Sequence, residues 1–170
     1  MIAHADDELS VGSVIVAEDL PAYVRRVEPP ACRERALALL ARAEQSRDSL
    51  ASKLRARGYA AQTVRVVLDE LEDDGIVDDA RFSEVWLNAR VRRAAEGPRA
   101  LVAGLVRRGV SPDVAESAVE SLIANNPEVR TWALRRAIDK ILRSRSMTQE
   151  ELSARLLRKG FTHADIRDIF

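Results

Sequence analysis

Three glycines at one constant spacing constrain the fold of this chain more than any other feature of its sequence. Gly58, Gly109 and Gly160 are 51 residues apart, and basic residues precede each of them. Eight positions counted from each glycine are apolar in all three copies, which makes 24 apolar positions where a content of 46% predicts about 11. A fixed period of this length is typical of a tandem array of similar structural units.

Each unit is predicted to contain three helices. Apolar residues four positions apart, such as Leu50 and Leu54, lie on one face of a helix. Each repeated glycine falls where a helix ends, in a position that needs a left-handed backbone. Thr148 and Glu151 form the pattern of a capping box at a helix start. The helices are predicted near residues 31–44, 47–57, 61–74, 79–95, 98–108, 112–125, 127–145, 149–159 and 163–170.

The predicted fold class is all-α, a tandem array of three three-helix units that forms an elongated, curved body. An aromatic content of 4% and only seven glycines in 170 residues agree with this fold class. Helices this short are marginal alone, so the stacking of neighbouring units should supply much of the stability. The expected units cover residues 32–78, 79–126 and 127–170.

Residues 1–31 differ from the rest of the chain. They lack helical periodicity and contain Pro21, Pro29 and Pro30, so we expect an acidic N-terminal arm that is flexible. The arm holds six acids and two bases, whereas residues 32–170 hold 21 acids and 25 bases. The net charge of zero therefore hides opposite charges on the two parts, and it does not exclude a charged partner.

One stretch of the chain carries a family resemblance. The segment from Leu71 to Phe82, LEDDGIVDDARF, followed by Arg90 and by Gly97 and Pro98, resembles the central signature of the RecX family of bacterial recombination regulators. The leucines before each repeated glycine are similar to the tandem three-helix units of that family. The resemblance covers about residues 32–170 and leaves the N-terminal arm outside it.

Membership in this family implies a regulator that binds the RecA recombinase. Such a protein is expected to lie in the groove of the RecA filament on single-stranded DNA and mainly to inhibit strand exchange and ATP hydrolysis. It would act in recombination, DNA repair and the SOS response. Single- and double-stranded DNA are further partners that the resemblance allows.

The acidic run has several interpretations. Seven of the eleven residues from Asp69 to Asp79 are acidic. One interpretation is a helix cap, because the carboxylate of Asp78 or Asp79 can accept the free amides of a helix that starts at Ala80. A solvated face is a second interpretation, and a contact with a basic protein partner, which the resemblance favours, is a third. The candidate acidic contacts are Asp73, Asp74, Asp78 and Asp79.

The basic residues also have more than one interpretation. Arginine makes up 24 of the 27 bases, and its guanidinium can bind phosphate or carboxylate through two hydrogen bonds. Bases at helix ends instead favour the helix dipole without any ligand, and others can be solvated. The candidate contacts with a filament or with DNA are Arg81, Arg90, Arg92, Arg93, Arg99, Arg107, Arg108, Arg135, Arg136, Lys140, Arg143, Arg158 and Lys159. Arg135, Arg136, Lys140 and Arg143 recur at spacings of three to five residues, so several of them could share one stripe of a helix.

Other classes of function find little support in the sequence. A single cysteine, Cys32, and two distant histidines, His4 and His163, argue against a disulfide framework, a metal site or a catalytic pair. We therefore expect no cofactor and no enzyme activity. No run of 18 apolar residues and no signal peptide occurs, so we expect a cytoplasmic monomer without membrane contact.

Two alternative functions stay open. A helical-repeat DNA-binding module acting without RecA would use the same arginines, and its binding would fall steeply with salt. A nuclease would need the acidic run to hold a metal ion. Aromatic residues are too few for an interleaved base-stacking platform. Trp86 is expected in the core, whereas Trp132 suits either the core or a partner.

Overall fold

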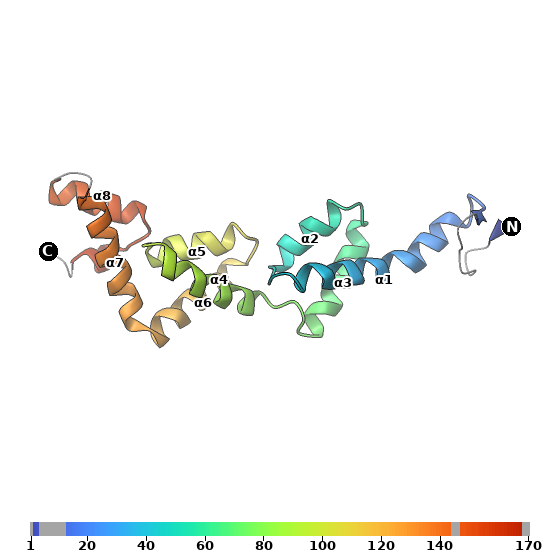
Figure 1. The fold of residues 1–170 in the computed structure, drawn as a ribbon, viewed down its shortest axis with the longest axis horizontal. Helices are drawn as coiled ribbons and strands as arrows, with labels where there is room; N and C mark the ends of the chain where they lie inside the picture. Colours follow the sequence, from blue (N-terminus) through green and yellow to red (C-terminus); the bar gives the residue numbers. More distant parts are fainter. Residues whose placement is uncertain (1, 4–12, 144–146, 168–170) are drawn as a thin grey trace. The chain divides into compact units, whose positions relative to one another are not determined.

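The computed structural model describes residues 2–3, 13–143 and 147–167, and most of them are helical (Figure 1). The all-α tandem array of three-helix units is therefore confirmed. Residues 1 and 4–12 of the predicted arm, His4 among them, lie outside the described residues, as do the last residues of the helices predicted at 127–145 and 163–170. The helices are α1 (Leu20–Leu40), α2 (Arg47–Arg55), α3 (Ala61–Asp73), α4 (Asp79–Arg93), α5 (Pro98–Val106), α6 (Pro112–Asn125), α7 (Pro127–Leu142), α8 (Gln149–Arg158) and α9 (His163–Arg167).

The helices belong to two compact units. The first contains α1, most of α2, and α3, together with a two-residue parallel pair of strands, β1 (Ile2–Ala3) and β2 (Val14–Ile15). The second contains α4 to α9 and also residues 46–48 at the start of α2. Within the described residues, no helix is long and apolar enough to cross a membrane.

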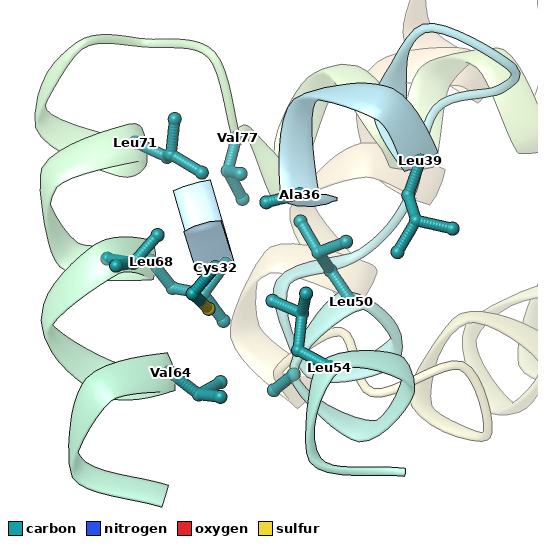
Figure 2. Packing of buried hydrophobic residues seen from close by; sticks show 11 residues of the cluster. Cys32, Ala36, Leu39, Leu50, Leu54, Val64, Leu68, Leu71 and Val77 are labelled. Atoms are coloured by element: carbon teal, nitrogen blue, oxygen red, sulfur yellow. The ribbon is translucent and has the colours of Figure 1, made fainter. Parts of the chain in front are cut away.

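The core of the first unit lies between α3 and the pair α1 and α2. Figure 2 shows Val64 and Leu68 of α3 pointing toward Cys32 of α1 and Leu54 of α2. Leu54 and its repeat equivalents Leu105 and Leu156 are all 0% exposed, each in the core of its own three-helix group. The spacing of apolar residues thus places the core correctly. Burial raises the pKa of the Cys32 thiol, and nearby Glu28 raises it further, so this cysteine is a packing residue.

The start of the first helix was predicted wrongly, because α1 begins at Leu20 and not near residue 31. Pro29 and Pro30 lie inside α1, where each removes a backbone hydrogen bond. Glu28 ties this part of α1 to the start of α3, since its carboxylate accepts the amide of Ala60 at 2.8 Å and the hydroxyl of Thr63. A contact between residues far apart in the sequence leaves no periodic signal. The apolar periodicity therefore did not reveal the first part of α1.

The three repeated glycines have the backbone that the repeat predicts. Their φ angles are +92° at Gly58, +84° at Gly109 and +85° at Gly160, in the left-handed region. The amide of the residue after Gly109 and Gly160 donates to a carbonyl one turn back on the preceding helix, at Leu105 and Leu156 respectively. Each glycine therefore closes the second helix of its three-helix group.

The start of the last helix depends on a buried carboxylate that the sequence patterns did not reveal. Asp165 accepts the amide of Thr162 at 2.5 Å and its hydroxyl at 2.7 Å, and it also pairs with Arg130 of α7. Burial would raise the pKa of Asp165, but the hydrogen bonds from Thr162 and the Arg130 guanidinium outweigh it. The pKa of this carboxyl group therefore lies below its usual value.

This lowered pKa predicts a loss of stability in acid. The contribution of ionised Asp165 should be complete above about pH 4, near the pKa of an unfolded aspartate, and should be lost as the pH falls through the lower pKa of the folded state. The Asp165→Asn variant should be less stable at neutral pH but lose less stability on acidification. Urea midpoints measured at several pH values check this. Equal acid sensitivity of the two proteins would contradict it.

Candidate functional site

Two acids of the predicted contact set cap helices. Asp78 accepts the amides of Ala80 and Arg81 at 2.8 and 2.9 Å, which confirms its predicted role as the cap of α4. Asp79 accepts the amide of Arg47 at the start of α2, at 2.8 Å. Burial raises the pKa of Asp79, and this hydrogen bond opposes the rise. Both carboxylates are thus committed to the fold.

The remaining acids of the set lie at the end of α3. Asp74 forms an ion pair with Arg33 at 2.8 Å, and Glu70 approaches the same guanidinium at 3.8 Å. Asp73 is exposed. No three His, Cys, Asp or Glu side chains converge as a metal site requires anywhere in the described part of the chain. The acidic run is a capping and pairing region with an exposed edge.

Several predicted basic contacts are occupied within their own unit. Arg90 makes two hydrogen bonds to Glu96, at 2.9 and 2.5 Å, and the hydrogen bonds raise its pKa. Arg81 lies 3.9 Å from the capping carboxylate of Asp78. The Arg90 guanidinium is therefore satisfied by a neighbouring acid, whereas that of Arg81 makes a long ion pair.

The indole of Trp86 explains an unusual glycine in the second three-helix group. The guanidinium groups of Arg108 and Arg90 lie 4.7 and 5.9 Å from the Trp86 ring. A Cβ at Gly104, within α5, would lie 2.5 Å from the far edge of this ring. Glycine at this position therefore makes room for the indole, which agrees with the predicted packing of Trp86 against the core.

The basic residues at the ends of α5 and α8 have a structural role. Arg108 donates to the carbonyl of Gly104 at 2.8 Å, and Arg158 donates to the carbonyl of Ala154 at 3.4 Å. Each thereby satisfies a carbonyl near the end of its own helix, where positive charge also favours the dipole. Arg107 is exposed and Lys159 is half-buried at the same two turns. Arg99 is exposed near the start of α5.

Most of the predicted basic contacts on the long helix α7 lie on an exposed stripe. Trp132, Arg136, Lys140 and Arg143 follow one another at helical spacings of four, four and three residues, and all four are exposed. We call these four residues the α7 stripe. The large side chain of Trp132 is 43% exposed, and the Arg136 guanidinium lies 4.9 Å from its ring. Exposure of a tryptophan beside stacked arginine is typical of a contact surface.

The end of α4 adjoins the α7 stripe. Arg136 donates to the backbone carbonyl of Arg92 at 3.2 Å, which brings α4 and α7 together. Arg92 and Arg93 are both exposed there, and Arg135 is exposed on α7 beside the stripe. The structure thus gathers bases from two sequence segments that are far apart.

Two adjoining grooves in the second unit were not predicted. The larger, of about 810 Å³, lies along α4 and α6, and Glu84, Asp113 and Ser117 are among its polar lining residues. The smaller, of about 520 Å³, is lined by Arg92 and Trp132 among others. The residues that line both grooves are Asn88, Leu122 and Asn126. A row of polar residues every fourth position on α6 was the available sequence signal: Asp113, Ser117, Ser121 and Asn125.

Family models match the first two three-helix groups. A model described as "RecX, first three-helix domain" matches residues 32–71, and one described as "RecX, second three-helix domain" matches residues 78–119. Together they include the segment that caps α4 and the basic end of that helix.

Similar proteins and structures carry the same family name. "Regulatory protein RecX" of Mycobacterium sp. (strain KMS) is 34% identical over 139 residues, which are 78% of this chain and 76% of that protein. The protein of the same name from Halorhodospira halophila is 34% identical over 142 residues, 81% of this chain and 84% of its own length. The crystal structure of RecX from Lactobacillus salivarius has a TM-score of 0.71 at 20% identity, over 84% of this chain and 94% of that one.

Proposed function

This chain belongs to the RecX family of regulatory proteins, and from that membership we propose that it binds RecA filaments on single-stranded DNA and inhibits recombination by RecA. The observation that carries the proposal is the α7 stripe, together with the bases of α4 beside it. An exposed indole and several guanidinium groups suit a surface made of protein and nucleic acid, because arginine binds carboxylates and phosphates alike. The cytoplasm is where such a regulator would act.

We propose that the regulation is non-enzymatic. Asp78 and Asp79, two of the acids that a nuclease would need for a metal ion, accept backbone amides in this fold. Inhibition would follow from occupancy, because a helical array bound across successive subunits would obstruct strand exchange and filament growth. Several modest contacts on one scaffold add avidity when their spacing matches the filament.

The test is a measurement of RecA ATPase activity and strand exchange with and without the purified protein, at several salt concentrations. We expect inhibition of both activities, and we expect binding to the filament to be tighter than binding to bare single-stranded DNA. Unchanged RecA activities at every salt concentration would contradict the proposal.

A second candidate function is a DNA-binding module that acts without RecA. The α7 stripe favours it as well, since an exposed tryptophan can stack on a base while neighbouring cations bind phosphates. Tight binding to bare DNA that falls steeply with salt, combined with no effect on RecA, would support this second function. The measurements at several salt concentrations therefore distinguish the two candidate functions.

A further inference from the structure

The second helices of neighbouring three-helix groups meet end to end. At the start of α5, the amide of Gly97 donates to the carbonyl of Lys159 at 2.8 Å, and the amide of Arg99 donates to the carbonyl of Gly160 at 3.1 Å. A Cβ on Gly160 would overlap the backbone of Ala100. The free amides at the start of α5 thus bind the free carbonyls that follow α8.

The start of α2 makes the same kind of joint with the end of α5. The hydroxyl of Ser46 donates to the carbonyl of Arg108, and a Cβ on Gly109 would overlap the side chain of Asp48. The Ser46 side chain is buried, at 0% exposed. A glycine turn at the end of one second helix therefore packs again on the start of another.

The two joints are repeats of each other. Ser46 and Gly97 are 51 residues apart, and so are their acceptors Arg108 and Lys159. In one joint the donor is a hydroxyl and in the other it is a backbone amide, yet the accepting carbonyl belongs to the same position of the repeat. The interface is thus a property of the repeating unit rather than of one particular pair of residues.

In the part of the chain that the structure describes, one half of the joint is exposed at each end of the series. The glycine turn after α2, Arg57 and Gly58, is exposed, and nothing lies within 4 Å of a Cβ placed on Gly58. The start of α8, Thr148 to Glu150, is exposed as well. Thr148 occupies the repeat position of Ser46 and Gly97, and it carries the same hydroxyl group as Ser46.

We propose that the glycine turn after α2 of one copy docks on the start of α8 of a second copy. The hydroxyl of Thr148 would donate to the carbonyl of Arg57, as Ser46 does to Arg108. Charges on the two surfaces are complementary, because Arg57 is basic and Glu150, at the repeat position of Asp48, is acidic. We take a second copy of this chain as the partner, because in both internal joints a glycine turn of this chain already packs on the start of a second helix.

Such a contact is head to tail, so it extends to further copies unless the rotation between copies closes a ring. Each joint involves few residues, and we expect weak association in dilute solution, which accords with a monomer at low concentration. Binding of neighbouring copies along a common filament would raise their effective concentration and strengthen the contact. The association itself requires neither RecA nor DNA.

Analytical ultracentrifugation of the purified chain over a range of concentrations tests the contact without any partner. The wild type should show an average mass that rises steadily with concentration. Arg57→Glu and Glu150→Arg, each alone, should weaken association about tenfold, because each sets like charges against each other. An equimolar mixture of the two variants, and a chain carrying both changes, should associate again.

The charge exchange also keeps the test independent of folding, since a misfolded variant would not recover in the mixture. A wild type that stays monomeric at every concentration overturns the proposal. Association that ignores both charge changes overturns it too. None of these outcomes bears on inhibition of RecA, which is measured separately.

Discussion

Replacement of Gly160 by alanine is expected to destabilise the second unit by about 3 kcal/mol or more, whereas the same change at Gly58 should cost about 1 kcal/mol. Both glycines have a left-handed backbone, with φ of +85° and +92°. A Cβ at Gly160 would also overlap the backbone of Ala100, but one at Gly58 would meet nothing within 4 Å. The difference between the variants therefore measures the close approach at the joint and not the backbone strain.

Urea unfolding followed by far-ultraviolet circular dichroism gives both values. Gly58→Ala serves as the matched control, because it carries the same chemical change at the same repeat position. The fluorescence of Trp86 and Trp132 reports on the second unit alone, since both tryptophans lie there. Equal losses in the two variants would mean that the end-to-end packing of α8 on α5 contributes little.

Reversal of two charges on the α7 stripe, Arg136→Glu with Lys140→Glu, is expected to weaken inhibition of RecA by about a hundredfold. Each reversal removes an attraction and adds a repulsion toward a polyanionic or acidic surface, and each is worth roughly a factor of ten or more. Both side chains are exposed, but Arg136 also donates to the carbonyl of Arg92, so the free energy of unfolding should fall by about 1 kcal/mol.

The matched control carries the same change of net charge on the first unit. Arg42→Glu with Arg65→Glu alters two exposed bases of the first unit, whereas the α7 stripe belongs to the second. Inhibition of RecA ATPase should be nearly unchanged in this control, and the salt dependence of binding should become shallower only in the α7 variant. Equal losses in both variants would show that net charge, and not the α7 stripe, governs binding.

Local patterns were enough to predict most helices and their ends. The capping box of Thr148 and Glu151 is present, and Asp78 caps α4 as its position before the helix indicated. These features depend on residues three or four positions apart, which a sequence displays directly. The predicted start of the first helix failed because the contact between Glu28 and the start of α3 joins residues far apart in the chain.

The structure was needed to tell which charged residues pair within the fold and which remain exposed. In the sequence, Asp79 and Arg90 were candidate partner contacts like the charged residues near them. In the structure, Asp79 caps α2 and Arg90 pairs with Glu96. Asp165 was not a candidate at all, although Arg130 lies against it from α7. A charged side chain has no periodic signal for its partner, because any nearby opposite charge or free amide satisfies it.

The repeat, the helical class and the turns that need glycine can be inferred from the amino-acid order alone, because spacing and backbone conformation are local properties. Which bases remain exposed on α7, and how α5 and α8 join end to end, became visible only in the folded chain. These features depend on groups from distant segments meeting at hydrogen-bond distance, as the carbonyl of Lys159 meets the amide of Gly97. The burial of a side chain and its hydrogen-bond partners depend on the packed chain. Arginines that look alike in the sequence therefore have different structural roles.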